Sequence, residues 1–339
     1  MNNKIKKILI VRPDKIGDLV LILPAILSLQ KNLPTLQISL LVSSYAKDLT
    51  DFMENIDKII IDNQDIKKLT TEIKKYQFDA VISLFSTFHI ARVLKKTKIP
   101  IRIAPATKIW QFYYNHRIPQ RRSLSLKPEY EYNTDLISYF VTAFFKTDLQ
   151  QKSPPYLKLE QKTKQQVLSQ FYQNYPELEN KKIIFVHPGS GGSAQNLNLE
   201  QYAKIIISLI KKGYVPIISP GVSVTEQENA LILQNIIKNK KIKIYQPEKK
   251  HSSLKDFIKL LSIVDVFIAG STGPLHISAA FNKKTIAFYP NRQSATAIRW
   301  QTINAKNNRL YFSPPQSCDD MTKIDIDKII PQIISFIKQ

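Results

Sequence analysis

Short apolar runs rich in β-branched residues alternate with longer segments of helical spacing along most of the 339-residue chain. Strands that are apolar on both faces and separated by helices form parallel sheets covered on both sides. The alternation therefore predicts an α/β fold with two doubly wound domains. In the first half we expect strands at residues 7–11, 37–42, 58–61, 80–84 and 99–103, and helices at residues 24–32, 45–54 and 66–76. In the second half we expect strands at residues 182–186, 215–219, 241–245, 264–269 and 285–288, and helices at residues 199–212, 225–238, 253–262 and 274–281.

The alternation is interrupted near the middle of the chain. Ser153-Pro154-Pro155 and the polar run at residues 160–182 separate the two halves. We place the domains at residues 1–160 and 161–322, followed by a terminal helix at residues 323–339. Two such domains facing each other form a central cleft at the carboxyl ends of their strands, where α/β proteins bind their ligands.

The composition excludes several classes of protein. A chain with 43% hydrophobic residues is not disordered, and its single cysteine, Cys318, excludes a disulfide scaffold and favours a reducing, cytoplasmic compartment. The longest apolar run, residues 19–27, is interrupted by Pro24, so we expect no spanning helix and at most attachment to a membrane surface. The formal charge of +22, from 49 Lys+Arg and 27 Asp+Glu, is compatible with polyanionic partners.

Glycine is rare, and the first 188 residues contain only Gly17. It lies in the turn Arg12-Pro13-Asp14-Lys15-Ile16-Gly17-Asp18, where it allows a tight turn or the close approach of a ligand. Asp18 suits the N-cap of the next helix, and it equally suits a carboxylate that accepts a proton at the end of the strand. The turn lacks Gly-x-Gly-x-x-Gly and the chain lacks a P-loop signature, which disfavours nicotinamide, flavin and P-loop nucleotide sites.

Two more glycine clusters follow expected strands in the second half. They are residues 187–193, His-Pro-Gly-Ser-Gly-Gly-Ser, and residues 270–276, Gly-Ser-Thr-Gly-Pro-Leu-His. A Ser/Thr/Gly turn that leads into a helix offers backbone N–H donors to a phosphate. One such loop is more often an ordinary capped connection, but two in one domain favour a phosphate site. His187 and His276 lie beside these loops and suit contacts with the same oxygens.

In this order and spacing the motifs resemble the heptosyltransferase-like glycosyltransferases of family 9, which have the GT-B fold of two facing Rossmann-like domains. Residues 12–24 resemble the family's N-terminal signature, and residues 187–190 resemble the start of its nucleotide-sugar domain. Residues 271–280 are similar to its donor-phosphate motif, and residues 318–324, Cys-x-x-Met-x-x-Ile, resemble its C-terminal signature. The resemblance covers nearly the whole chain.

The resemblance implies inverting, metal-independent transfer of a sugar, typically L-glycero-D-manno-heptose from ADP-heptose, to an acceptor such as the inner core of lipopolysaccharide. It implies that the first domain binds the acceptor, that the second binds the nucleotide sugar, and that Asp18 is the catalytic base, with no cofactor. The donor-binding residues expected from the loops and the resemblance are Gly189, Ser190, Gly191, Glu226, Ser271, Thr272, Gly273 and His276. The expected acceptor-binding residues are Arg12, Lys15, Gly17, Arg117 and Arg121.

Two departures from the family pattern concern the substrates. Ser271 stands where heptosyltransferases commonly carry aspartate, and a hydroxyl does not replace a charged acceptor of hydrogen bonds. Gln195-Asn196-Leu197-Asn198 stands where they commonly have Lys-x-Trp-Pro, so the family lysine is missing. The sugar and the acceptor therefore stay open, and a family 9 transferase with another nucleotide sugar is an alternative.

Residues 80–128 contain ten lysines and arginines and no acidic residue, with aromatic residues at 110 and 112–114. This segment suits a solvated surface, or a face for an anionic glycolipid and the inner-membrane surface. The same residues suit nucleic acid, so a non-catalytic nucleic-acid-binding protein is the alternative from another class. That alternative leaves the glycine clusters unexplained, and we expect no nucleic acid partner. Asp325-Ile326-Asp327 spells a metal-binding DxD, but acidic residues at a helix start explain it better.

Overall fold

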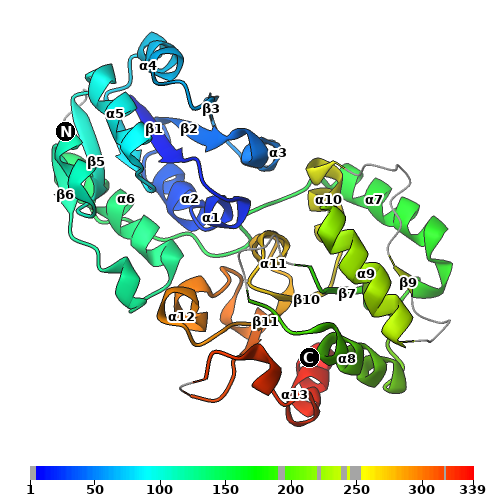
Figure 1. Cartoon of the computed structure of the whole chain (residues 1–339). Coiled ribbons are helices and arrows are strands. Elements are labelled where there is room, and N and C mark those ends of the chain that lie inside the picture. The colour runs from blue at the N-terminus through cyan, green and yellow to red at the C-terminus, as the bar shows by residue number, and fades with distance from the viewer. Residues whose placement is uncertain (1–4, 190–194, 220–222, 238–242, 245–252, 317) are drawn as a thin grey trace. The chain divides into compact units, whose positions relative to one another are not determined.

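The computed structural model describes residues 5–189, 195–219, 223–237, 243–244, 253–316 and 318–339. The chain forms two compact units, Met1–Ser153 and Pro154–Gln339 (Figure 1). The division falls ahead of the expected boundary after residue 160, because the intervening segment is bonded to the second unit. The N–H groups of Tyr156 and Leu157 both donate to the carbonyl of Ala280, at 2.8 and 3.0 Å.

The first unit is built on a six-stranded parallel sheet in the order β3-β2-β1-β4-β5-β6. β1 pairs with β2 on one side and with β4 on the other, and its residues from Ile8 to Val11 are fully buried. The strands are β1 (Lys7–Arg12), β2 (Gln37–Ser43), β3 (Lys58–Asp62), β4 (Ala80–Ser83), β5 (Ile101–Pro105) and β6 (His116–Ile118). The α-helices are α1 (Ile16–Val20), α2 (Leu23–Asn32), α3 (Lys47–Thr50), α4 (Ile66–Lys75), α5 (Phe88–Thr97) and α6 (Glu129–Phe145), and the 3₁₀ helices are η1 (Ser44–Ala46), η2 (Ile109–Tyr113) and η3 (Arg122–Leu124).

The second unit repeats this topology in a six-stranded parallel sheet of order β12-β11-β10-β7-β8-β9. The strands are β7 (Ile184–His187), β8 (Pro216–Ile218), β9 (Lys243–Ile244), β10 (Val266–Gly270), β11 (Lys284–Phe288) and β12 (Arg309–Phe312). The α-helices are α7 (Gln161–Asn174), α8 (Leu199–Lys211), α9 (Val224–Ile237), α10 (Leu254–Leu261), α11 (Gly273–Ala280), α12 (Ala297–Trp300) and α13 (Ile326–Lys338). The 3₁₀ helices are η4 (Pro176–Leu178), η5 (Gln293–Ala295), η6 (Lys306–Asn308) and η7 (Met321–Lys323).

Helices cover both faces of each sheet, as continuous apolar strands require. In the first unit α4 and α5 pack on the face that carries Leu9 and Val11, and Figure 1 shows α2 and α6 on the opposite face. In the second unit α8, α9 and α13 pack on the face that carries Ile184 and Val186. In the described part of the chain, no helix is both long and apolar enough to span a membrane.

The expected α/β fold is confirmed, and the local differences have identifiable causes. The strand expected from residue 99 begins at Ile101, because Lys98 ends α5 in the left-handed region and Pro100 has no N–H to donate. The polar run at residues 160–182 contains α7, which buries only Phe171 and therefore lacks a visible apolar stripe. The helix expected at residues 45–54 is broken into the short η1 and α3.

Candidate active site

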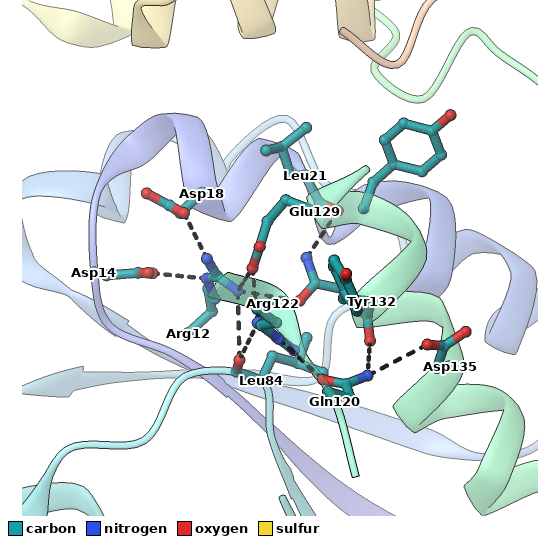
Figure 2. Close-up of polar contacts among 12 residues, drawn as sticks. Arg12, Asp14, Asp18, Leu21, Leu84, Gln120, Arg122, Glu129, Tyr132 and Asp135 are labelled. Carbon is teal, nitrogen blue, oxygen red and sulfur yellow. Dashed lines mark hydrogen bonds and ion pairs between the residues drawn. The ribbon is translucent and has the colours of Figure 1, made fainter. Parts of the chain in front are cut away.

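The turn after β1 places Asp18 inside the first helix. α1 begins at Ile16, its N-cap residue is Lys15, and no side chain caps it. Asp18 is the third helical residue, and its Oδ1 accepts a hydrogen bond of 2.5 Å from Nη2 of Arg12 (Figure 2). The N-cap interpretation of Asp18 is therefore wrong, since its carboxylate binds a guanidinium rather than free backbone N–H groups.

Arg12, the last residue of β1, is the centre of a buried charged cluster, and its side chain is only 2% exposed. Nε donates to Asp14 at 2.8 Å, and Nη1 donates to Glu129 at 3.3 Å. Nη1 also donates to the Asn133 side chain at 3.0 Å and to the Leu84 carbonyl at 3.4 Å. Burial disfavours the positive charge, but the surrounding carboxylates outweigh burial and raise the pKa of Arg12.

Glu129 and Arg122 extend this cluster to the start of α6 (Figure 2). Oε1 of Glu129 accepts a second hydrogen bond from Nη1 of Arg122, at 2.7 Å. Nη1 of Arg122 also donates to the Leu84 carbonyl, at 3.1 Å, so both arginines bind the chain just after β4. Arg122 is thus held within the unit, whereas Arg117 and Arg121 are exposed.

Asp14 and Asp18 are the two carboxylates of the cluster that reach its surface, each with a side chain 13% exposed. Burial raises the pKa of Asp14 to about 6, with Arg12 opposing this shift and Asp18 adding to it. No hydrogen bond from the described residues engages Oδ2 of Asp18. A carboxylate oriented through one oxygen, with the other unengaged at the protein surface, is able to accept a proton.

The acceptor residues predicted from the sequence fall into two places in the first unit. Arg12 ends β1, Lys15 is the N-cap of α1, and Gly17 lies beside Asp18 in α1; of these three residues, Lys15 has the exposed side chain. Arg117 lies in β6, which β4 and β5 separate from β1 in the sheet. The structure thus brings together the residues of the turn but leaves Arg117 at the edge of the sheet.

The two glycine-rich loops of the second unit follow neighbouring strands, since His187 at the end of β7 pairs with Ala269 of β10. A Cβ atom on Gly189 would lie 2.6 Å from Cγ of Glu226, and one on Gly270 would lie 2.5 Å from Oδ1 of Asn196. Both positions therefore need glycine because of close packing. Ser190 and Gly191 lie outside the described residues.

Asn196 lies in the segment that departs from the family pattern, and its side chain joins these two loops. Its Nδ2 donates to the carbonyls of Pro188 and Gly189, both at 3.3 Å. Its Oδ1 accepts from the Tyr202 hydroxyl at 2.6 Å and lies against Gly270. An amide that donates and accepts can hold two backbone turns together.

The start of α11 presents unpaired polar groups, as a phosphate site requires. Thr272 is the N-cap residue, but its side chain makes no capping bond. Oγ1 of Thr272 and Nδ1 of His276 are buried, and neither has a hydrogen-bond partner among the described residues. Burial lowers the pKa of His276 to about 4, which keeps this imidazole neutral at neutral pH. Gly273 and Ser271, the other residues predicted here, are partly exposed.

Glu226 lies next to Gly189 of the loop after β7. Both residues were expected to bind the donor, and their proximity is compatible with that prediction. Glu226 is the third residue of α9, and its Oε2 accepts from the N–H of Ser223 at 3.1 Å. Its Oε1 lies 3.6 Å from Nε2 of His187. Burial acts to raise the pKa of Glu226, but the nearby His187 imidazole and the hydrogen bond from Ser223 prevail and lower it to about 2.

The DxD sequence belongs to a helix start. Asp325 is the N-cap of α13 and accepts from the N–H of Lys328 at 3.4 Å, while Asp327 pairs with Lys204. The helix-start interpretation is confirmed. Among the described residues, no three His, Cys, Asp or Glu side chains gather in a way that could hold a metal ion.

Sequence comparisons identify the family to which the chain belongs. The model of glycosyltransferase family 9 (heptosyltransferase) matches residues 66–324. The chain is 41% identical to a Haemophilus influenzae protein named only as a glycosyltransferase, over 98% of this chain and 97% of that protein. It is 28% identical to lipooligosaccharide heptosyltransferase 2 of Campylobacter jejuni, over 88% of this chain and 86% of that protein. The chain therefore belongs to glycosyltransferase family 9.

Solved structures extend the likeness to the whole fold. A family 9 glycosyl transferase from Veillonella parvula matches with a TM-score of 0.80 at 13% identity, covering 100% of this chain and 99% of that chain. The ADP-heptose heptosyltransferase II of E. coli matches with a TM-score of 0.76 at 16% identity, covering 98% and 99%. The expected GT-B class is confirmed. Membership of an enzyme family removes the alternative of a non-catalytic nucleic-acid-binding protein.

Proposed function

We propose that this glycosyltransferase moves heptose from ADP-heptose to the inner core of lipopolysaccharide or a related glycan, with Asp18 as the general base. The single observation that supports this most is the Asp18 carboxylate, which is fixed through Oδ1 and unengaged at Oδ2 where the order of the first sheet reverses. Ligands of doubly wound sheets bind at such switch points. The donor is taken from the Campylobacter relative, a heptosyltransferase, and from solved heptosyltransferases described with ADP or an ADP-heptose analogue.

The reaction is a single displacement at the anomeric carbon of the donor. Asp18 takes the proton of the acceptor hydroxyl while the hydroxyl oxygen bonds to that carbon. The bond to the nucleoside diphosphate breaks on the opposite face, and its electron pair leaves with the diphosphate, so the configuration inverts. Negative charge grows on the leaving diphosphate, and the N-terminus of α11 is suited to stabilise it through backbone N–H groups and Thr272.

The second unit is suited to bind the donor without a metal ion. Gly189 and Gly270 let the side chains of Glu226 and Asn196 pack closely against the two loops. The buried Oγ1 of Thr272 and Nδ1 of His276 have no hydrogen-bond partner among the described residues and are available to a phosphate. Neutral His276 can donate a hydrogen bond to a phosphate oxygen in its Nδ1-protonated tautomer. Ser271 favours a second candidate, a different nucleotide sugar, because its hydroxyl replaces the aspartate common in heptosyltransferases.

The acceptor is proposed to be an anionic glycolipid at the cytoplasmic face of the inner membrane. Between β5 and α6 the first unit exposes Ile109, Phe112 and Leu126, each more than 60% exposed. The guanidinium of Arg117 lies 5.0 Å from the centre of the Phe112 ring. Apolar side chains beside exposed cations suit an anionic bilayer, where each surface cation contributes about 1 kcal/mol.

The donor is tested first by thermal shift with ADP, UDP, GDP and ADP-heptose, each with and without EDTA. ADP and ADP-heptose should raise the melting temperature of the second unit equally in both conditions. Transfer is then measured by mass spectrometry with ADP-heptose and heptose-deficient lipopolysaccharide. A mass increase of one heptose supports the proposal. Binding of UDP or GDP alone would favour the second candidate, and loss of binding in EDTA would contradict metal-free binding.

A further inference from the structure

One continuous path of ion pairs connects Asp18 to the start of α6 (Figure 2). Oδ1 of Asp18 accepts from Nη2 of Arg12 at 2.5 Å. Nη1 of Arg12 donates to Oε1 of Glu129 at 3.3 Å, and the same oxygen accepts from Arg122 at 2.7 Å. Arg12 and Glu129 are each 2% exposed and lie 117 residues apart in the sequence. The base therefore depends for its orientation on a helix that begins far along the chain.

Arg12 has no nitrogen left without a protein partner. Nε binds Asp14, Nη2 binds Asp18, and Nη1 is shared among Glu129, Asn133 and the carbonyl of Leu84. A buried guanidinium with this set of partners is poorly suited to reach a sugar acceptor. Its contact with Asp18 is the one through which it can influence the reaction.

We propose that Arg12 is a positioning residue, held by Glu129, that fixes the Asp18 carboxylate so that Oδ2 meets the acceptor hydroxyl. This inference rests on the proposed role of Asp18 as the base. The planar fork of arginine can hold carboxylates at Nε, Nη1 and Nη2 at once, whereas a lysine ammonium is a single point. A misplacement of about 1 Å in a reacting group can lower the rate about 100-fold. A contact that fixes the orientation of the Asp18 carboxylate therefore supports turnover.

The number of carboxylates around Arg12 also fits this role. Here Asp14, Asp18 and Glu129 divide the charge of Arg12, and Arg122 donates to Glu129 as a second cation. Fully ionised, the group has three negative and two positive charges. Asp18 is thus held in place by a cation that it shares with two other carboxylates.

A double-mutant cycle on the full-length enzyme tests the proposal. Turnover of ADP-heptose with heptose-deficient lipopolysaccharide is measured for the parent, Arg12→Lys, Asp18→Asn and the double variant. Arg12→Lys keeps the charge but loses the fork, so kcat should fall tenfold or more while the donor KM changes less than threefold. In the Asp18→Asn background the same substitution should change kcat less than threefold, because Arg12 acts through Asp18.

The controls separate positioning from folding. Arg309→Lys changes an arginine that binds the Asn304 carbonyl and the Gln301 side chain, outside both sites, and should keep kcat within twofold. Glu129→Gln is nearly isosteric and serves if Arg12→Lys does not fold. It should lower kcat threefold or more with Asp18 present and less than twofold with Asn at position 18.

Each outcome separates the two proposals. Parental kcat in Arg12→Lys, or equal losses in both backgrounds, overturns the positioning role and leaves the base intact. Parental kcat in Asp18→Asn removes the base itself, and the positioning role with it. If the parent uses another nucleotide sugar, the donor assignment fails and the cycle is run with the sugar found by thermal shift.

Discussion

Each of the two units has a switch point, the place where the strand order of its sheet reverses, and the two switch points carry different side chains. In each unit the strand order reverses beside a central strand, between β1 and β4 in the first and between β7 and β10 in the second. Buried charges centred on Arg12 fill the first point, whereas Gly189, Gly270 and the buried hydroxyl and imidazole groups of α11 surround the second. The proposed function assigns proton acceptance to the first point and anion binding to the second, so the same topology would serve two chemistries through different side chains.

The largest effect on stability is expected at the first point. Arg12→Met leaves three carboxylates without their shared cation, so the first unit should lose about 3–5 kcal/mol of unfolding free energy. Trp110 lies in the first unit and Trp300 in the second, so urea unfolding followed by fluorescence in a Trp300→Phe background reports the first unit alone. As the control, Lys328→Met removes an exposed partner of Asp325 and should cost about 0.5 kcal/mol or less. Equal losses in the two variants would contradict the buried cluster.

At the second point, steric crowding should matter more than charge. Gly189→Val forces side-chain atoms against Glu226 and His187, and overpacking of this kind costs about 1–3 kcal/mol. ADP affinity, measured by calorimetry, should fall tenfold or more because the loop after β7 is displaced. A Cβ at Gly213 meets nothing within 4 Å, so Gly213→Ala should strain the backbone but leave ADP affinity unchanged. Parental ADP affinity in Gly189→Val would show that this loop does not contact the nucleotide.

The two points should respond to pH in opposite directions. The pKa of Asp14 is raised to about 6 by burial, so its contribution to stability is lost as pH rises from about 4 to about 6. The pKa of His276 is lowered to about 4 by burial, so its contribution is lost as pH falls from about 6.5 to about 4. Each slope is at most about 1.4 kcal/mol per pH unit.

Unfolding at several pH values, compared between the parent and one variant, isolates each group. The free energy of unfolding of Asp14→Asn, minus that of the parent, should increase as the pH rises. The same difference for His276→Gln should increase as the pH falls. Slopes of the same sign in both comparisons would contradict the contrast between the two points.

The smallest expected effect concerns the surface of the first unit. Reversing Arg117 and Arg121 to Glu should weaken binding to phosphatidylglycerol vesicles by about 1 kcal/mol or more per residue, measured by sedimentation at low salt. Lys211 and Lys212 are exposed in the second unit, and their reversal changes the net charge equally. Vesicle binding by this control should stay near the parent. Similar losses in both double variants would show that net charge, and not this surface, attracts the membrane.

Most of the fold could be predicted from the sequence because apolar residues recur at different spacings in strands and in helices. The strands expected at residues 7–11, 37–42 and 285–288 match β1, β2 and β11 within one residue at each end. β6 and β12 were missed because they are edge strands that are mostly not buried, so neither shows the continuous apolar run of the central strands. α6 was missed as well, because its long apolar face is interrupted by the buried Glu129 and Asn133 of the charged cluster.

The site could be predicted only where a local signal existed. Gly17, Gly189 and Gly273 could be proposed as site residues because rare glycines follow expected strands. The contact of Arg12 with Glu129 spans 117 residues and has no local pattern. Asn196 had one indirect signal, the capping box of Asn198 and Gln201, which starts α8 and leaves Asn196 in the loop beside Gly270.

Asp18→Asn tests most directly the assignment of proton acceptance to the first unit and anion binding to the second. The side chain keeps its shape but loses its basic oxygen, and general-base catalysis contributes about 10²–10⁴ in rate. Turnover should therefore fall at least about 100-fold, while ADP affinity measured on the same preparation stays within twofold. Turnover within a few fold of the parent, or loss of ADP binding together with turnover, would contradict this division of roles.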